Sequence, residues 1–228
     1  MQRPRIALLN ASHRDANTSR NFRRECRADL AEFDVTAGQL PATFDFDAVI
    51  ITGSKSSVYW DEPWIPPLKD WVGAAIDRDL PVLGVCYGHQ LVADVLGGTV
   101  EPMGEYELGY RTVRHAGNSA LFDGVDEEFV VFTSHSDAVT ELPQDATITA
   151  TNDKAIQGFQ LDRAFGIQFH PEYDKATSIA ITEEKDLPRE RIDAVLEGIT
   201  PDAVAAAHES KAIFDNFDRI IDRVRTPA

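Results

Sequence analysis

Short apolar runs alternate with amphipathic segments along the first half of the chain. The runs are continuously hydrophobic, which is typical of strands buried on both faces of a parallel sheet. Apolar residues at helical spacing lie between them, and Gly97 and Gly98 end the third helical segment. The pattern predicts strands at 5–10, 35–37, 48–52 and 81–85, and helices at 17–33, 68–78 and 91–96. Alternating strands and helices predict an α/β fold, with βαβ crossovers forming a mostly parallel sheet that has helices on both faces.

From Thr99 onward the pattern changes. Short strand-like segments now follow one another between turn residues, at 100, 108–115, 129–132, 147–150, 156–160 and 165–169. They predict antiparallel or mixed additions to the first sheet, with extra antiparallel strands. Toward the C-terminus the chain becomes helical, with a short helix at 193–196 and a long one over 202–224 that follows Thr200 as N-cap.

Nothing in the composition divides the two halves. The chain shows no linker rich in Pro, Gly or Ser, no repeat and no low-complexity segment. We therefore expect one domain over residues 1–228, with a core at about 5–180 and a helical extension at about 181–228.

The charge balance restricts the partners. The chain has a formal net charge of −16, from 38 acidic and 22 basic side chains. This argues against nucleic-acid binding, which needs clustered Lys and Arg. An acidic, lysine-poor surface resembles that of proteins from salt-loving organisms, where high ionic strength screens the repulsion.

The sequence gives no sign of a membrane or a metal. No apolar run approaches the roughly 20 residues of a membrane span, and the N-terminus lacks the apolar stretch of a signal peptide. The two cysteines, Cys26 and Cys86, lack metal-ligand spacing. We expect a cytoplasmic protein without a metal or cofactor, in which Cys26 packs in the core.

Cys86 lies in the pattern of a nucleophile elbow. The strand that ends at Val85 leads through Gly84-x-Cys86-x-Gly88 into a helix. Glycines flank such a nucleophile because the sharp turn leaves no space for nearby β-carbons. The helix start favours the thiolate over the thiol. The alternative, a small buried cysteine, does not account for the flanking glycines.

His170-Pro171-Glu172 supplies the partners that a nucleophile needs. Residues i and i+2 of an extended segment lie on the same side, so Glu172 is placed to accept a hydrogen bond from the His170 imidazole. Alone, the tripeptide arises by chance, and a histidine at a strand end is usually structural. Together with an elbow 84 residues upstream, it predicts a Cys-His-Glu triad.

These motifs resemble those of the class I glutamine amidotransferase family. The likeness rests on Gly84-x-Cys86-x-Gly88-x-Gln90, His170-Pro171-Glu172, Ile51-Thr52-Gly53-Ser54 and Thr133-Ser134-His135-Ser136-Asp137. The last stretch is similar to the glutaminase domain of GMP synthetase, and the resemblance covers about residues 5–180. It implies a flavodoxin-like, doubly wound α/β fold.

The resemblance also implies a role for each matching residue. Cys86 attacks the side-chain amide carbon of glutamine and forms a glutamyl thioester, while His170 protonates the departing ammonia and then activates water, held by Glu172. The backbone N–H groups of Gly53 and Tyr87 form the oxyanion hole. The remaining matches, which contact the substrate, are Gln90, Ser134 and His135.

Two departures from the family pattern stand out. Thr52-Gly53-Ser54 replaces the Gly-Gly-Pro of many relatives, which predicts a differently shaped oxyanion loop or a simple turn. Ser136 replaces a glycine, so that Asp137 is open to interpretation as a turn cap. Three histidines have no matching context: His13, His115 and His208. His89 is expected to pack or to lie on the surface. Trp60 and Trp64 are expected to pack in the core or in a lid, with the mouth of the pocket as the alternative.

Three functions remain open. No phosphate-binding loop of the G-x-x-x-x-G-K-[S/T] type is present, so no ATP-activating module is visible. The first function is therefore a glutaminase subunit that supplies ammonia to a separate synthetase subunit. The second is a stand-alone γ-glutamyl peptidase with the same triad. The third, a protein that only binds or regulates, leaves the intact Cys86, His170 and Glu172 unexplained.

Overall fold

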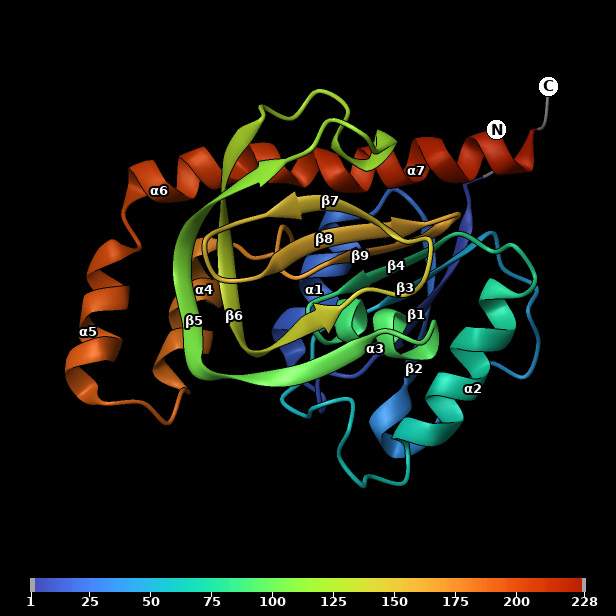
Figure 1. The fold of residues 1–228 in the computed structure, drawn as a ribbon, viewed down its shortest axis with the longest axis horizontal. Helices are drawn as coiled ribbons and strands as arrows, with labels where there is room; N and C mark the ends of the chain where they lie inside the picture. Colours follow the sequence, from blue (N-terminus) through green and yellow to red (C-terminus); the bar gives the residue numbers. More distant parts are fainter. Residues whose placement is uncertain (1–2, 227–228) are drawn as a thin grey trace.

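A nine-stranded mixed sheet forms the centre of the structure, a computed structural model that describes residues 3–226 (Figure 1). The parallel part consists, in spatial order, of β2 (Asp29–Asp34), β1 (Arg5–Asn10), β3 (Ala48–Ile51), β4 (Val82–Val85) and β9 (Ala164–Ile167). The antiparallel part continues with β8 (Ile156–Leu161), β7 (Thr147–Thr151), β5 (Thr99–His115) and β6 (Glu128–Glu141). The predicted α/β class, with a mostly parallel core and added antiparallel strands, is confirmed.

Helices cover both faces of the parallel strands. The α-helices are α1 (Ala16–Glu25), α2 (Ile65–Ile76), α3 (Tyr87–Val95), α4 (Lys175–Glu183), α5 (Arg189–Gly198), α6 (Pro201–Ala206) and α7 (Ala212–Arg225). Short 3-10 turns occur at Val35–Ala37 (η1), Ala120–Phe122 (η2) and Ala207–Lys211 (η3). No helix within residues 3–226 has the length and apolar character needed to cross a membrane.

Alternation along β1 divides the apolar core into two layers. Ile6 and Leu8 face the layer that contains Phe22 of α1 and Phe217 of α7. Ala7 and Leu9 face the opposite layer, which is formed by α2 and α3. In Figure 1, α7 runs along one side of the molecule, away from α2 and α3. A third, smaller cluster joins the long strands β5 and β6 to α4, α5 and α6.

The predicted helix over 17–33 is wrong beyond Glu25. The helix ends where the N–H of Cys26 donates to Phe22 O, and Asp29–Asp34 then pairs in parallel with β1 as an edge strand. The helical spacing that predicted this segment is coincidental, because Phe22 lies in α1, Cys26 follows that helix, and Leu30 and Phe33 lie in β2. The strand predicted at 35–37 is also wrong, since Asp34 caps a single 3-10 turn there.

Other segments differ mainly in their bounds. The helix predicted at 68–78 begins at Ile65, because a proline is tolerated in the first turn, where its missing N–H is not needed. The long C-terminal helix predicted over 202–224 is divided into α6, η3 and α7. The strand predicted at 129–132 extends to Glu141, which puts Thr133–Asp137 within β6 and in register with β5.

Candidate active site

Cys86 occupies a strained turn between β4 and α3. Its backbone has φ 55° and ψ −102°, a region that residues with a β-carbon rarely adopt. A β-carbon on Gly84 would lie 2.2 Å from Gly88 O, and one on Gly88 would lie 2.4 Å from Ile51 O. Cys86 N donates to Ile167 O at 2.8 Å, which anchors the turn to β9. Close packing on both sides therefore requires the two glycines and holds the sulfur at the turn.

Replacing Gly84 by alanine is expected to lower the free energy of unfolding by about 3 kcal/mol, because backbone atoms meet the new methyl group. Urea denaturation measures the change. Gly198→Ala is the matched control: it has open space around its β-carbon position and an ordinary φ, and it should change stability by less than about 0.5 kcal/mol. Equal stability of the two variants would contradict this account of the turn.

His170 and Glu172 lie just beyond the end of β9. His170 N donates to Phe132 O at 2.9 Å, which ties this segment to β6. His170 Nδ1 lies 2.8 Å from Glu172 Oε1, and both side chains are buried. The ring of Tyr173 stacks on the imidazole, with centroids 4.1 Å apart and planes inclined by 17°. The imidazole is therefore fixed at its Nδ1 edge and on one face.

The structure brings Cys86 and His170 together beside Gly53. A β-carbon on Gly53 would lie 3.0 Å from His170 Cε1 and 3.7 Å from Cys86 Cβ. Burial lowers the pKa of His170, but the charges of Glu172 and Cys86 outweigh it and raise the value to about 10. An imidazolium close to a carboxylate and a sulfur is the charge pattern of an activated cysteine.

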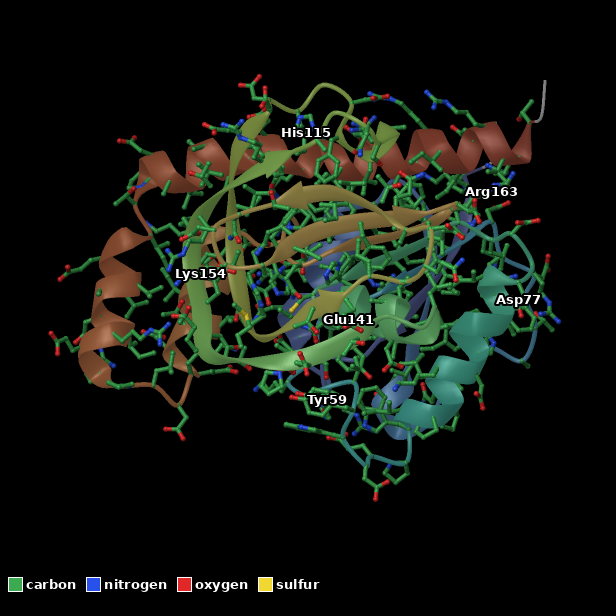
Figure 2. The ribbon with its side chains drawn as sticks, viewed as in Figure 1. Tyr59, Asp77, His115, Glu141, Lys154 and Arg163 are labelled. Atoms are coloured by element: carbon green, nitrogen blue, oxygen red, sulfur yellow. The ribbon has the colours of Figure 1, made fainter. Side chains whose placement is uncertain are left out.

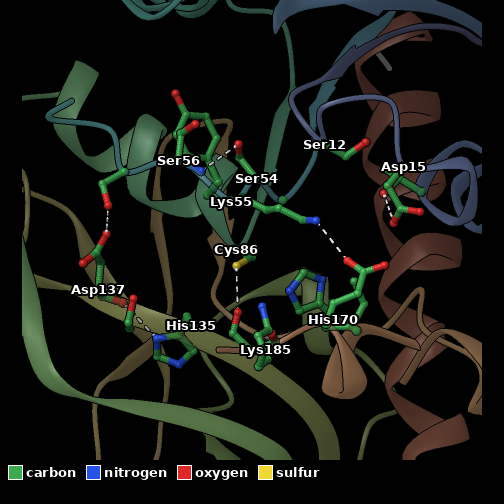
Figure 3. Close-up of a pocket in the computed structure, with 18 of the residues that line it drawn as sticks. Ser12, Asp15, Ser54, Lys55, Ser56, Cys86, His135, Asp137, His170 and Lys185 are labelled. Carbon is green, nitrogen blue, oxygen red and sulfur yellow. Dashed lines mark hydrogen bonds and ion pairs between the residues drawn. The ribbon is translucent and has the colours of Figure 1, made fainter. Parts of the chain in front are cut away.

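A pocket of about 380 Å³ opens above Cys86 (Figure 3). It contains every residue predicted for the site: Gly53, Cys86, Tyr87, Gln90, Ser134, His135, His170 and Glu172. The Lys55 side chain passes over the sulfur, and its ammonium forms a 2.9 Å ion pair with Glu184, just after α4. Both members of this pair are more than half exposed, so it adds little stability across the pocket mouth.

Gly53 and Tyr87 both lie next to Cys86. Tyr87 is the first residue of α3, so its N–H has no acceptor within the helix. Gly53 follows β3 and lines the pocket next to Cys86 and His170. Gly53 and Tyr87 thus bring backbone from two separate elements, the loop after β3 and the start of α3, to the pocket.

Gln90 and Ser134 also line the pocket, but they have protein partners as well. Gln90 Nε2 donates to Asp137 O and to Gln168 Oε1, both at 3.1 Å. The carbonyl oxygen of Ser134 lies 3.8 Å from Cys86 Sγ, and its hydroxyl is 3.5 Å from that of Tyr106. His135 touches the pocket too, although both of its ring nitrogens contact protein oxygens.

Asp137 is not a turn cap, which corrects the interpretation from the sequence. It lies within β6, and its carboxylate accepts hydrogen bonds from the hydroxyls of Ser57 and Tyr59. Tyr59 lies at the rim of the molecule on the loop after β3 (Figure 2). Residues 54–57 therefore belong to a tethered loop that lines the pocket, and they are not a simple strand-ending turn.

The unmatched residues fall into two groups. His89 is fully buried and Trp64 nearly so, which agrees with packing roles. Trp60 is exposed and lies outside the pocket.

Sequence reasoning missed pocket residues that carry no motif, namely Ser12, Asp15, Lys55, Tyr106, Tyr173 and Lys185. Only Tyr173 offered a signal, because it directly follows His-Pro-Glu. Within residues 3–226 no three His, Cys, Asp or Glu side chains are grouped as metal ligands.

Comparison with known proteins gives the family. The sequence model described as "Glutamine amidotransferase class-I" matches residues 13–183, most of the chain. The chain belongs to the class I glutamine amidotransferase family. As a member of that family it carries the elbow, the tethered loop after β3 and most of the residues of the pocket within the matched region.

Curated relatives of this amidotransferase include glutamine-hydrolyzing GMP synthases. Those of Thermobifida fusca and Pyrobaculum aerophilum are each 42% identical to it, over 129 and 126 residues. The matched regions cover 55% of this chain but only 23% and 24% of the two relatives. The family likeness therefore concerns about a quarter of each relative.

Solved structures share the fold over almost the whole chain. A glutamine amidotransferase from Thermotoga maritima superimposes with a TM-score of 0.78 at 21% identity, covering 96% of this chain and 99% of that one. One from Methylobacillus flagellatus gives 0.77 at 19% identity, with 96% and 95% covered. At these identities the likeness establishes the architecture.

Proposed function

We propose that this amidotransferase hydrolyses the side-chain amide of glutamine through a thioester on Cys86. The observation that carries the proposal is the meeting of Cys86, His170 and Glu172 at one pocket, with the cysteine on a glycine-flanked turn. Family membership supports the reaction class, and the GMP synthases among the curated relatives are described as glutamine-hydrolyzing.

In the first half of the reaction, the Cys86 thiolate attacks the amide carbon. The carbonyl oxygen becomes negative and is met by the N–H groups of Gly53 and Tyr87. His170 then gives its proton to the amide nitrogen, the C–N bond breaks, and ammonia leaves. A glutamyl thioester on Cys86 and a neutral imidazole remain.

In the second half, His170 removes a proton from water, which attacks the thioester. The tetrahedral intermediate collapses to release the Cys86 thiolate and the new γ-carboxylic acid, which loses its proton to solvent as glutamate, while His170 keeps the proton that it took from water. The charge of Cys86 is one cause of the raised pKa of His170. Acylation removes that charge, which lowers the pKa of His170 and so favours the neutral imidazole that can accept a proton from water.

The fate of the ammonia is a further part of the proposal. The chain matches only about a quarter of the length of the GMP synthases. The family model matches residues 13–183, which include Cys86 and His170. We propose that a separate synthetase subunit receives the ammonia. The acidic, lysine-poor surface favours an assembly that works at high salt.

The second candidate is a γ-glutamyl hydrolase with the same triad. One observation favours it: the pocket continues past Cys86 from the Asp137 side to Ser12 and Asp15, which lie on the other side of the sulfur (Figure 3). An amine or peptide leaving group would extend into this second half. Ammonia would not need it.

Turnover of two substrate classes tests both candidates. The protein is incubated at low and high salt with glutamine and with a panel of γ-glutamyl amines and peptides, and Cys86→Ala serves as control. We expect ammonia release from glutamine and a glutamyl adduct on Cys86 detected by mass spectrometry. Amine release without glutamine turnover would favour the second candidate, and the absence of adduct and turnover would contradict both.

A further inference from the structure

A buried charged pair lies where residues 134–137 of β6 line the pocket. Glu107 of β5 and His135 of β6 are directly opposite each other in the antiparallel register. Their side chains are 1% and 2% exposed, and His135 Nε2 lies 2.7 Å from Glu107 Oε2. Buried charges persist only when they are paired and hydrogen-bonded, so this pair needs an explanation separate from the triad.

Both ring nitrogens of His135 face oxygens that accept hydrogen bonds. Nδ1 lies 2.9 Å from the backbone carbonyl oxygen of Asp137, which has no proton to give (Figure 3). Nε2 faces the carboxylate of Glu107. A neutral imidazole has one donor and would leave a lone pair against one of these oxygens, whereas the imidazolium satisfies both.

The partners of Glu107 indicate that its carboxylate is ionised. Asn152 Nδ2 donates to Oε1 at 2.7 Å, and Gln157 Nε2 donates to Oε2 at 3.1 Å. Burial raises the pKa of Glu107, but the hydrogen bonds and charge of His135, the bond from Asn152 and the charge of Arg111 together lower it below its ordinary value. A carboxylate surrounded by donors has no acceptor for a proton of its own.

We propose that His135 is a fixed imidazolium, paired with Glu107, which positions the pocket wall at residues 134–137 and does not itself bind the substrate. The effect on substrate rests on the proposed glutamine hydrolysis. His135 is thus a positioning residue, in contrast to the substrate contact that its motif implies.

The wall connects three parts of the site. The Asp137 carbonyl accepts from both His135 Nδ1 and Gln90 Nε2, which ties β6 to α3. The Asp137 carboxylate holds the loop after β3 through Ser57. On the other side of His135, the Ser134 carbonyl faces the Cys86 sulfur at 3.8 Å. Loss of the buried pair therefore loosens the side of the pocket formed by residues 134–137. It leaves the contact between His170 and Glu172 unchanged.

Other charged groups around His135 do not replace Glu107. Arg111 of β5 lies 3.9 Å from Glu107 Oε1 and is itself a cation. The Asp137 carboxylate is engaged by Ser57 and Tyr59. His89 of α3 is neutral, since burial, helped by the charge of His135, lowers its pKa to about 3. Among these groups only Glu107 places a carboxylate oxygen against a ring nitrogen of His135.

Nuclear magnetic resonance of protein with labelled histidine tests the charge directly. At pH 7 we expect protons on both ring nitrogens of His135, with its signals assigned by their loss in His135→Gln. In Glu107→Gln, whose side chain has nearly the same shape, one of these protons should be absent at the same pH. A wild-type His135 with one unprotonated nitrogen at pH 7 would overturn the proposal, whether or not any variant folds and whether or not glutamine is the substrate.

Kinetics test the positioning role. In Glu107→Gln we expect KM for glutamine to rise about tenfold with a smaller change in kcat. The rate of Cys86 alkylation by iodoacetamide should stay within about twofold, because the triad is not in contact with Glu107. The matched control is Glu105→Gln, two residues away on β5, where the carboxylate forms only a surface ion pair with Lys154. Unchanged KM in a folded Glu107→Gln would refute the positioning role.

Discussion

Cys86→Ala is expected to reduce glutamine hydrolysis by about 10⁴-fold or more, because no other group can form the thioester. The fold should persist, since the substitution removes only a sulfur from a turn that the glycines shape. Ammonia release measures the activity, and circular dichroism and urea denaturation measure the fold. Residual hydrolysis above about one per cent of the wild-type rate would contradict a Cys86 nucleophile.

Cys26→Ala is the control for this variant. Cys26 packs against the core layer between the sheet, α1 and α7, and it does not line the pocket. Burial, with the nearby charge of Asp218, raises the pKa of its thiol well above the ordinary range, so it stays protonated and unreactive. We expect Cys26→Ala to retain activity and iodoacetamide to label Cys86 alone in the wild type.

The sequence was most informative where the chemistry lies in one short segment. The elbow depends on residues 84 to 88, whose glycines reflect contacts a few residues away or with the adjacent β3. The predicted contact between His170 and Glu172 is present, because only one residue separates them. The backbone at 171–172 forms a turn after β9, however, and not the extended segment from which the contact was predicted. The continuous apolar runs predicted β1, β3 and β4 correctly, since burial on both faces leaves a strong local pattern.

Contacts between distant segments could not be predicted in this way. The bonds from Ser57 and Tyr59 to Asp137 span about 80 residues, and no local pattern marks them. The pairing of Glu107 with His135 depends on the register of β5 and β6, which a bulge shifts between Pro102 and Glu107. The edge strand β2 was missed because it is only partly buried, which leaves its pattern weak enough to be read as a helix.

Glu172→Gln is expected to lower kcat by about 10²- to 10⁴-fold. Glutamine has nearly the same shape as glutamate, but it lacks the charge that stabilises the His170 imidazolium. Its amide can also donate to Nδ1 and so favour the wrong tautomer, which leaves Nε2 unable to take the proton of the cysteine. Steady-state ammonia release gives kcat. A variant with near wild-type kcat would argue against an orienting role for Glu172.

The same variant should change how stability depends on pH. In the wild type the folded-state pKa of His170, about 10, lies above its ordinary value of 6.5. The protonated form therefore stabilises the fold fully below about pH 6.5, and this contribution is lost as pH rises toward 10. Removing the Glu172 charge lowers the pKa of His170, so the stability gap between wild type and Glu172→Gln should be largest near pH 6 and should narrow by pH 10.

Urea denaturation at pH 6, 8 and 10 measures this gap, and a resonance titration of His170 measures the shift itself. Glu184→Gln is the matched control, because that carboxylate also borders the pocket but pairs with Lys55 at the mouth and does not contact His170. It should leave both measurements unchanged. A gap that widens toward pH 10 would mean that His170 is neutral in the folded enzyme, and the proton that ammonia needs on departure would then have to come from another group.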